Sequence, residues 1–238
     1  EMKEKALDEA RQYNEELLSS SIQLTDPFKA KKMDGETLFY NNILSLEGSG
    51  IMGYVKIPCI SVDLPIYHGT STEVLERGIG HLAASSFPIG GKSTHAVLTG
   101  HTGLSSAKLF TDLTEMKKGD LFFIHVLDKK LAYRVDQITV VKPEDTAWME
   151  IKAEKDLVSL VTCTPFGINS HRLIVTGHRV DYKEKEYIKI KPQLPSVREI
   201  IVTVFPILFV VSIVVIEIKN RIQTYRRQRR RKRREKNR

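Results

Sequence analysis

The sequence predicts a mainly β domain, either a barrel or a sandwich, with appended segments at both ends. The first observation is that short runs rich in Val, Ile, Tyr and Thr recur from Gly53 to Val180, separated by Gly, Pro, Asp and Lys. Several short strands at such spacing, with only brief helical insertions, are typical of β-barrels and β-sandwiches. The second observation is that the basic charge lies outside this region: the whole chain carries +8, and residues 219–238 carry +11, so residues 1–218 carry −3.

This distribution of charge excludes one class of function. A protein that binds duplex nucleic acid needs Lys and Arg on its folded surface. Here the folded part is mildly acidic and the Lys and Arg residues are concentrated in one terminal tail. We therefore expect no nucleic-acid partner, and we discount a nucleic-acid binder that acts through the tail.

Residues 1–21 predict an amphipathic helix, because Ala6, Ala10, Tyr13 and Leu17 share one helical face and a run of serines at 19–21 ends the pattern. Residues 22–49 are polar and irregular and contain the sequence Asp26-Pro27-Phe28. Residues 50–182 form the β domain, and residues 183–198 predict a linker.

Within the β domain the runs predict strands that are separated by turns. We expect a hairpin that turns at Asp128–Lys130, and short helices or loops at residues 71–90 and 105–118. No two histidines have the spacing of metal ligands, so we expect neither a metal nor a cofactor. The predicted strand runs are 54–60, 62–69, 95–101, 120–141, 156–163 and 172–180.

A run of 17 uncharged residues from Ile200 to Ile216 precedes the basic tail. This length is at the short end of the ~17–25 residues that a membrane-spanning helix needs, and a proline such as Pro206 is tolerated inside such a helix. We expect residues 199–218 to span a membrane, and the tail, 219–238, to lie on the cytoplasmic side at anionic lipid. The β domain would then be extracellular, with an export signal or span before residue 1. The alternative is a buried core helix.

The segment from Leu157 to Val180 predicts a hairpin. Its first strand should end at Thr164-Pro165, because proline cannot continue a central strand, and its second strand begins near Arg172. Cys163 and Arg172 then face each other. A nearby guanidinium favours the thiolate and can also bind an oxyanion. Three interpretations of Cys163 stay open here: a nucleophile, a disulfide partner of Cys59, or a small core residue. We expect Cys59 itself to be a free thiol in a strand.

A cysteine nucleophile also needs an acid–base partner, most often histidine. Two histidines, His101 and His178, lie in identical Thr-Gly-His triplets. His178 is six residues beyond Arg172 on the same strand, roughly 20 Å away at ~3.3 Å per residue. His101 ends a separate strand, where a side chain can project into a cleft. We therefore expect His101 to be the partner, with His68 as the second choice.

These motifs together resemble those of the sortases, membrane-anchored cysteine transpeptidases of Gram-positive bacteria. The family pattern Thr-Leu-x-Thr-Cys, followed about nine residues later by Arg and preceded by Thr-Gly-His, reads here as SLVTC at 159–163, Arg172 and His101. Ser159 replaces the first Thr but keeps its hydroxyl. The segment at 57–70, IPCISVDLPIYHGT, is also similar to the family. The resemblance implies an eight-stranded sortase β-barrel in which Cys163, His101 and Arg172 meet in one groove.

Two features outside the barrel resemble class C sortases, which polymerise pilin subunits. They are the C-terminal apolar run and the sequence Asp26-Pro27-Phe28, which is similar to the lid motif of that class. The resemblance implies cleavage of an LPXTG-like sorting signal at Thr–Gly and transfer to a lysine amine of another pilin subunit. We expect Phe28 to cover the groove above Cys163, and Asp26 to contact Arg172 or the cysteine.

Two other functions remain as alternatives. One is a housekeeping-type sortase that anchors surface proteins to peptidoglycan. The other is a non-catalytic, membrane-tethered β domain with a structural cysteine. The separate alternative for Asp26-Pro27-Phe28 is a turn in an irregular loop.

Overall fold

The computed structural model describes residues 1–19, 25–29, 38–45, 48, 50–103, 108–190 and 197–236. The chain divides into two units, Glu1–Pro192 and Gln193–Arg238. The boundary falls inside the predicted linker, and each unit is described by itself.

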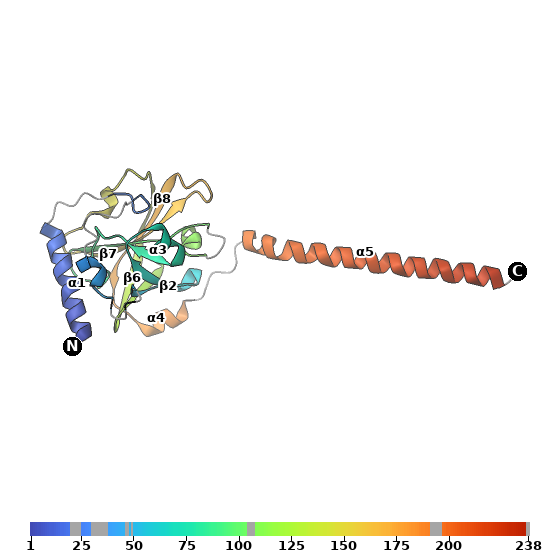
Figure 1. Cartoon of the computed structure of the whole chain (residues 1–238), viewed down its shortest axis with the longest axis horizontal. Helices are drawn as coiled ribbons and strands as arrows, with labels where there is room; N and C mark the ends of the chain where they lie inside the picture. The colour runs from blue at the N-terminus through green and yellow to red at the C-terminus, as the bar shows by residue number, and fades with distance from the viewer. Residues whose placement is uncertain are drawn as a thin grey trace. The chain divides into compact units, whose positions relative to one another are not determined.

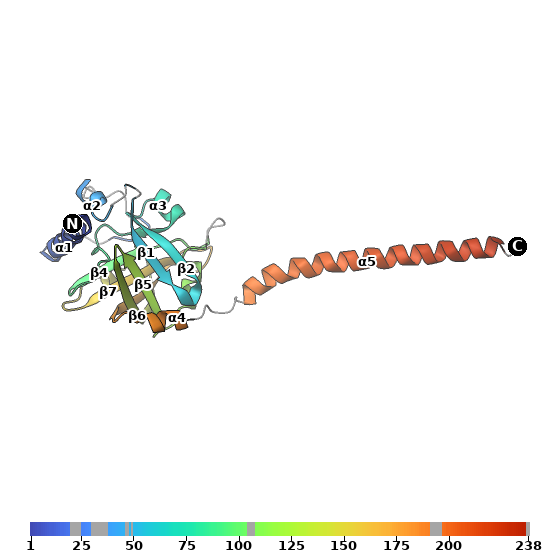
Figure 2. The same ribbon diagram turned by 90° about the horizontal axis from the view of Figure 1, so that it is seen from below.

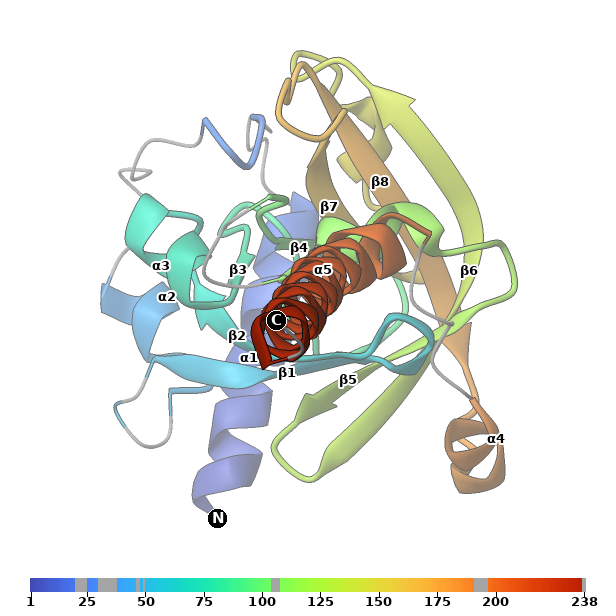
Figure 3. The same cartoon turned by 90° about the vertical axis from the view of Figure 1, so that its right-hand side faces the viewer.

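The first unit is built on a closed eight-stranded β-barrel, so the predicted barrel is confirmed (Figures 1 and 3). Neighbouring strands follow the order β1-β2-β3-β4-β7-β8-β6-β5. The β2–β3 and β4–β7 pairs are parallel, and the other pairs are antiparallel. The strands are β1 (Ile51–Ile57), β2 (Val62–His68), β3 (Ile79–His81), β4 (Thr94–Thr99), β5 (Leu121–Val126), β6 (Lys129–Val141), β7 (Asp156–Thr164) and β8 (His171–Val180).

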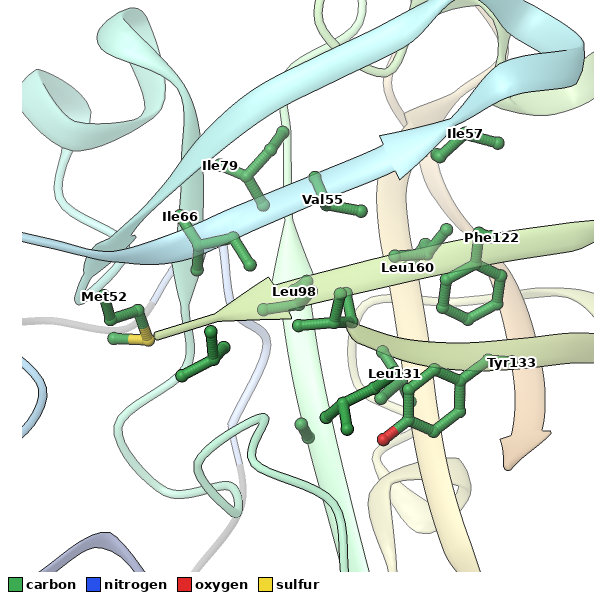
Figure 4. Packing of buried hydrophobic residues seen from close by; sticks show 14 of the residues in the cluster. Met52, Val55, Ile57, Ile66, Ile79, Leu98, Phe122, Leu131, Tyr133 and Leu160 are labelled. Carbon is green, nitrogen blue, oxygen red and sulfur yellow. The ribbon is translucent and has the colours of Figure 1, made fainter. Parts of the chain in front are cut away.

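The barrel interior is filled by apolar side chains from every second strand position. Val55, Phe122, Leu98 and Leu160 are fully buried and converge in the centre (Figure 4). Successive side chains of a strand point to opposite faces. Because Val158 and Leu160 of β7 point inward, Ser159, Val161 and Cys163 point to the outer face of the sheet. The strand pattern therefore places the Cys163 thiol outside the barrel core.

Helix α1 (Met2–Ser19) packs against the barrel through the face that the sequence predicted. Ala6, Ala10 and Leu17 are buried, and Asn14, which was not on the predicted list, is buried with them. The Asn14 side chain accepts a hydrogen bond from Phe87 N at 2.7 Å and donates one to Phe87 O at 3.3 Å. Tyr13 donates from its hydroxyl to the carbonyl of Ala83. These polar contacts fix α1 to the chain between β3 and β4.

The remaining short elements lie before, between and after the strands, and Figure 2 shows α2, α3 and α4 among them. They are the helices α2 (Leu38–Asn42), α3 (Thr72–Arg77) and α4 (Glu184–Lys189), and the 3-10 turns η1 (Pro58–Ile60), η2 (Thr111–Glu115) and η3 (Ala147–Met149). Helix α4 lies in the segment that was expected to be a linker, and its Tyr187 packs edge-on against Phe123. Tyr182, just before that segment, packs against the same ring.

The structure corrects three local predictions. Strand β3 occurs in the region 71–90 that was expected to hold only helices or loops, and its three residues are too few to show an alternating pattern. The β5–β6 hairpin turns at Leu127-Asp128 instead of Asp128–Lys130, with Leu127 in the left-handed region at φ 52°. Cys59 lies in η1 and not in a strand, because Pro58 and the left-handed Ser61 close a turn there. Cys59 and Cys163 are both free thiols, so the alternative disulfide is not found.

The second unit consists of one helix, α5 (Val197–Lys236), in its described part. The predicted span, residues 199–218, lies inside this helix, and its uncharged stretch is bounded by Glu199 and Glu217. Among the residues that the structure describes, no helix is both long enough and apolar enough to cross a membrane, so the predicted span is not found.

Candidate active site

Cys163 and Arg172 lie side by side at one end of the barrel. The hairpin of β7 and β8 pairs Cys163 directly with Arg172, as the sequence predicted. Strand β7 ends at Thr164, immediately before Pro165. The loop then folds back on itself, because the backbone N–H groups of Ile168 and Asn169 both donate to Pro165 O. This register brings a thiol and a guanidinium to the same edge of the sheet.

A second apolar cluster lies on the outer face of the sheet, beside Cys163. We call it the outer cluster, and it consists of Leu82, Ala84, Val97, Met149, Val161 and Ile174. Phe28, Val141 and Trp148 pack against it. Val97, Val161 and Ile174 come from the neighbouring strands β4, β7 and β8, whereas Met149 belongs to η3 in the β6–β7 connection. The outer cluster therefore forms an apolar floor next to the thiol, over which a residue of the N-terminal region is placed.

His101 follows the end of β4, and its backbone is fixed against the end of β7. Gly100 N donates to Val161 O at 3.0 Å, and the buried Thr162 hydroxyl donates to Gly100 O at 2.8 Å. Phe110 N donates to His101 O at 3.1 Å. A side chain at position 100 would have its Cβ 2.7 Å from Ile79 Cδ1 and 2.8 Å from Phe110 Cδ2, so only glycine fits there.

The strand pattern around Cys163 did not single out Thr162, although its hydroxyl has a structural role. Thr162 and Cys163 are successive residues of one strand, so their side chains point to opposite faces. Because Cys163 points outward, the Thr162 hydroxyl points into the protein and needs a hydrogen-bond partner there. That partner is the carbonyl one residue before His101, which ties the histidine to the cysteine strand.

Asp26, Pro27 and Phe28 form a turn that lies over this edge of the sheet. Lys29 N donates to Asp26 O at 2.9 Å, which closes a four-residue turn with Pro27 at its second position. The Asp26 carboxylate accepts two hydrogen bonds from Arg172, from Nε at 2.9 Å and from Nη2 at 2.6 Å. The expected contact between Asp26 and Arg172 is therefore present. We call residues 25–29 the lid turn.

Phe28 lies between the histidine and the arginine. Its ring centroid is 5.7 Å from that of His101, and the Arg172 guanidinium carbon lies 4.9 Å from the Phe28 centroid. The guanidinium is thus in the cation–π range. The lid turn therefore packs the Phe28 ring against the outer cluster, against His101 and against Arg172.

All three guanidinium nitrogens of Arg172 donate hydrogen bonds in this arrangement. Nε and Nη2 donate to Asp26, and Nη1 donates to the carbonyls of Asn169 and His171, both at 3.1 Å. The side chains of Arg172 and Asp26 are only 7% and 4% exposed. A substrate oxyanion could therefore bind Arg172 only after Asp26 has moved away.

Burial shifts the protonation of the thiol and the imidazole in opposite directions. Burial raises the pKa of Cys163, Arg172 lowers it, and Asp26 raises it again. Burial lowers the pKa of His101, which the field of Glu76 partly offsets. With Asp26 in place, the site at neutral pH holds a neutral thiol and a neutral imidazole. Movement of the lid turn would remove both the burial and the carboxylate.

The other candidate histidines lie elsewhere. His68, the second choice, contacts the carbonyls of Ile43 at 2.7 Å and Gly50 at 3.3 Å through its two ring nitrogens, so it is engaged by neighbouring backbone. His178 pairs with Leu157 at the far end of the hairpin, and its Nδ1 is 3.1 Å from Asp136.

Residues 55–180 match the sortase domain family, and the chain belongs to the sortases. Members of this family are cysteine transpeptidases that act on LPXTG-like sorting signals.

Three solved structures are similar to this chain. Sortase C-1 from Actinomyces oris is 46% identical, covers 75% of this chain and 98% of its own, and has a TM-score of 0.70. Sortase C from Streptococcus pneumoniae is 43% identical over 75% of this chain and 88% of its own, with a TM-score of 0.68. Sortase A from Corynebacterium diphtheriae is 42% identical over 76% of this chain and 86% of its own, with a TM-score of 0.72. Two of these similar structures are thus named sortase C, and the third is named sortase A.

Proposed function

We propose that this sortase is of class C and joins pilin subunits to one another. The observation that carries the proposal is the buried Asp26–Arg172 pair, which holds Phe28 between His101 and Arg172. This lid turn resembles the lid motif of class C sortases, and it keeps the thiol covered until a sorting signal displaces it. The similarity to sortase C of Streptococcus pneumoniae, whose structure bears on pilin substrate specificity, supports the same assignment.

In the proposed reaction, the Cys163 thiol gives its proton to His101, and the resulting thiolate attacks the carbonyl carbon of the threonine in an LPXTG-like signal. The carbonyl oxygen becomes an oxyanion, which the Arg172 guanidinium stabilises with its planar set of N–H donors. His101 protonates the glycine amine as the Thr–Gly bond breaks, and a thioester remains on Cys163.

The second half of the reaction releases the thioester to an amine. A lysine side chain of another pilin subunit loses a proton to His101 and attacks the thioester carbonyl. Arg172 again faces the oxyanion, and collapse of the intermediate restores the thiol and forms an isopeptide bond. A thioester suits this transfer, because it keeps the acyl group reactive towards amines while it reacts only slowly with water.

The proposed roles agree with how the residues are held. Cys163 and Arg172 are fixed by strand pairing, and His101 is fixed by the hydrogen bond from Thr162 to Gly100. The outer cluster is the nearest apolar surface for the side chains of a sorting signal once Phe28 has left it. Substrate and lid turn would therefore compete for one surface and one arginine.

The second candidate acceptor is the amine of peptidoglycan, which the similarity to a sortase A supports. An assay that offers both nucleophiles separates the two functions. The protein, a sorting-signal peptide, a lysine-bearing pilin domain and a peptidoglycan stem-peptide amine are mixed, and the products are counted by mass spectrometry. We expect the lysine isopeptide to dominate; a product that carries only the stem-peptide amine would assign the anchoring function.

The proposal also places the first unit outside the cytoplasm, where sorting signals of exported proteins reach it. The basic segment 219–238 would lie against anionic lipid at the membrane surface. Protease treatment of intact protoplasts should therefore remove the barrel. A barrel that is degraded only after the cells are lysed would contradict the location.

A further inference from the structure

Thr99, the last residue of β4, carries a buried hydroxyl that lacks a hydrogen-bond partner. Its side chain is fully buried, and its Oγ1 has no partner within the part of the chain that the structure describes. Most buried polar groups in proteins are hydrogen-bonded, because an unpartnered group has lost its contact with water and gained nothing in return. An exception two residues before His101 therefore needs an explanation.

The alternation of β4 places Thr99 on the outer face of the sheet. Leu98 belongs to the core of the barrel interior (Figure 4), whereas Val97 belongs to the outer cluster. Thr99 is two positions beyond Val97, so its side chain points to the same face as that of Val97. Its strand partner on β7 is Val161, a second member of the outer cluster. The hydroxyl therefore borders the apolar floor against which Phe28 packs.

Thr99 lies close to the proposed reacting groups on this face. It precedes His101 by two residues, and its partner Val161 precedes Cys163 by two residues on β7. Two strand positions span roughly 6.6 Å, at ~3.3 Å per residue. Phe28 packs against the outer cluster and against His101, which flank Thr99 on either side. The lid turn therefore covers this stretch of the outer face, and its departure would give a substrate access to the hydroxyl.

The neighbouring strand β3 supplies no polar side chain to Thr99. Gly80 is the partner of Thr99 in the β3–β4 pair. A Cβ at Gly80 would be 2.4 Å from Gly69 O and 3.0 Å from Leu75 Cδ2, so this side is filled by backbone and by an apolar side chain. A new partner for the hydroxyl must therefore approach from the side on which Phe28 packs.

A peptide in extended conformation brings a matching acceptor to this position. When the threonine carbonyl of an LPXTG-like signal lies at Cys163, the residue two positions earlier in the signal lies about two strand positions away. That residue is proline, which has no N–H, so its backbone offers only a carbonyl. We propose that the Thr99 hydroxyl donates a hydrogen bond to this proline carbonyl and so fixes the register of the signal. The inference rests on the proposed function, because it takes the sorting signal as the substrate.

The test compares Thr99→Val, which removes the hydroxyl but keeps the branched shape, with Thr99→Ser, which keeps the hydroxyl. Cleavage of an LPXTG-type peptide is measured in an Asp26→Ala background, where the ion pair that holds the lid turn is absent. We expect KM to rise about tenfold in Thr99→Val, since a hydrogen bond is lost and a peptide carbonyl is left unpaired. The kcat should change by less than about twofold, because the contact is equally strong before and during the reaction. Thr99→Ser should restore KM.

The stability of the same variants separates this role from a structural one. Replacing a buried, unpartnered hydroxyl by a methyl group should raise the urea midpoint of the otherwise wild-type protein. Thr162→Val is the matched control, because the hydroxyl of Thr162 donates to Gly100 O, and its loss should lower the midpoint. A lower midpoint in Thr99→Val would show that its hydroxyl has a partner inside the protein, and would overturn the proposal.

A modified substrate identifies the partner group of Thr99. In a peptide whose amide after the proline is replaced by an ester, the proline carbonyl is a weaker acceptor. This change should raise KM for the Asp26→Ala protein, but alter it by less than about twofold when Thr99→Val is also present. Equal increases in the two proteins, or an unchanged KM in Thr99→Val, would overturn this inference alone. Absence of any cleavage by the Asp26→Ala protein would overturn the proposed function together with it.

Discussion

Asp26 and Arg172, 146 residues apart in sequence, form a two-point ion pair that is almost completely shielded from solvent. Asp26 lies in the lid turn, and Arg172 is the strand partner of Cys163. The pair therefore connects the state of the lid turn directly to the group that is proposed to bind the oxyanion. Breaking a buried pair by removing one partner costs about 3–5 kcal/mol, because a charge is left without compensation. A protein that loses Asp26 can avoid this cost by exposing Arg172 to water.

Asp26→Ala should therefore open the lid turn. We expect Cys163 to react with a thiol alkylator at least about tenfold faster than in the wild type, since loss of several kcal/mol shifts the open fraction by more than that factor. Hydrogen exchange at residues 26–29 should become faster as well. Lys29→Ala is the control, because it removes only the exposed 3.7 Å pair with Glu144 and should change neither rate much. Equal alkylation rates in Asp26→Ala and the wild type would remove the lid from the mechanism.

The pH dependence of the same alkylation reports the electrostatics of the site. Burial raises the pKa of Cys163, Arg172 lowers it, and Asp26 raises it again. Since only the thiolate reacts, the rate should increase about tenfold per pH unit below this pKa and level off above it. Asp26→Asn should shift the whole profile to lower pH, because the carboxylate no longer disfavours the thiolate and the thiol becomes better solvated. A profile that stays in place, or moves to higher pH, would contradict the assigned contribution of Asp26.

Three substitutions test the proposed catalytic residues. Cys163→Ala and His101→Ala should abolish transpeptidation, and Arg172→Ala should lower kcat by about 10²–10³, the range found when an oxyanion donor is lost. His178→Ala is the matched control for His101→Ala, because both occupy Thr-Gly-His triplets but His178 lies at the other end of the hairpin. Circular dichroism should show that all four proteins are folded. An active His101→Ala together with an inactive His178→Ala would reverse the assignment of the acid–base residue.

Asn14→Ala tests how α1 is held on the barrel. The substitution leaves the N–H and C=O groups of Phe87 without the partners seen in the structure, and each buried group of this kind costs about 1–3 kcal/mol. We expect the free energy of unfolding, measured with urea, to fall by roughly 2 kcal/mol. Gln12→Ala on the exposed face of α1 should change it by less than about 0.5 kcal/mol. Equal effects of the two substitutions would show that the Asn14 contacts do not stabilise the fold.

Local sequence patterns indicated the β domain and the pairing of Cys163 with Arg172, whereas the closed barrel was implied by the resemblance to the sortases. Alternating apolar residues mark strands, and a proline at position 165 marks where one of them must end. The hairpin loop is short, so strand pairing leaves little freedom in the register. The rise per residue of a strand is also fixed, so the distance from Arg172 to His178 on the same strand could be estimated from the sequence.

Other features depend on contacts between distant segments and carry no local pattern. Strand β3 has only three residues, and its pairing with β2 is favoured by Gly80, where a Cβ would be 2.4 Å from Gly69 O. Asn14 is a polar residue on an apolar helical face, and only the fold reveals its partner, Phe87. The hydrogen bond from Thr162 to Gly100 likewise joins segments that are 62 residues apart.

The most direct test of the central claim is mass spectrometry of the protein after incubation with an LPXTG-type sorting-signal peptide, with Asp26→Ala used beside the wild type. We expect a covalent adduct on Cys163 with the mass of the peptide up to its threonine, more of it in Asp26→Ala, and none in Cys163→Ala. Addition of a lysine-bearing pilin domain should remove the adduct and release an isopeptide-linked product. Unmodified Cys163 in Asp26→Ala at saturating peptide, or an adduct on a different residue, would contradict the account.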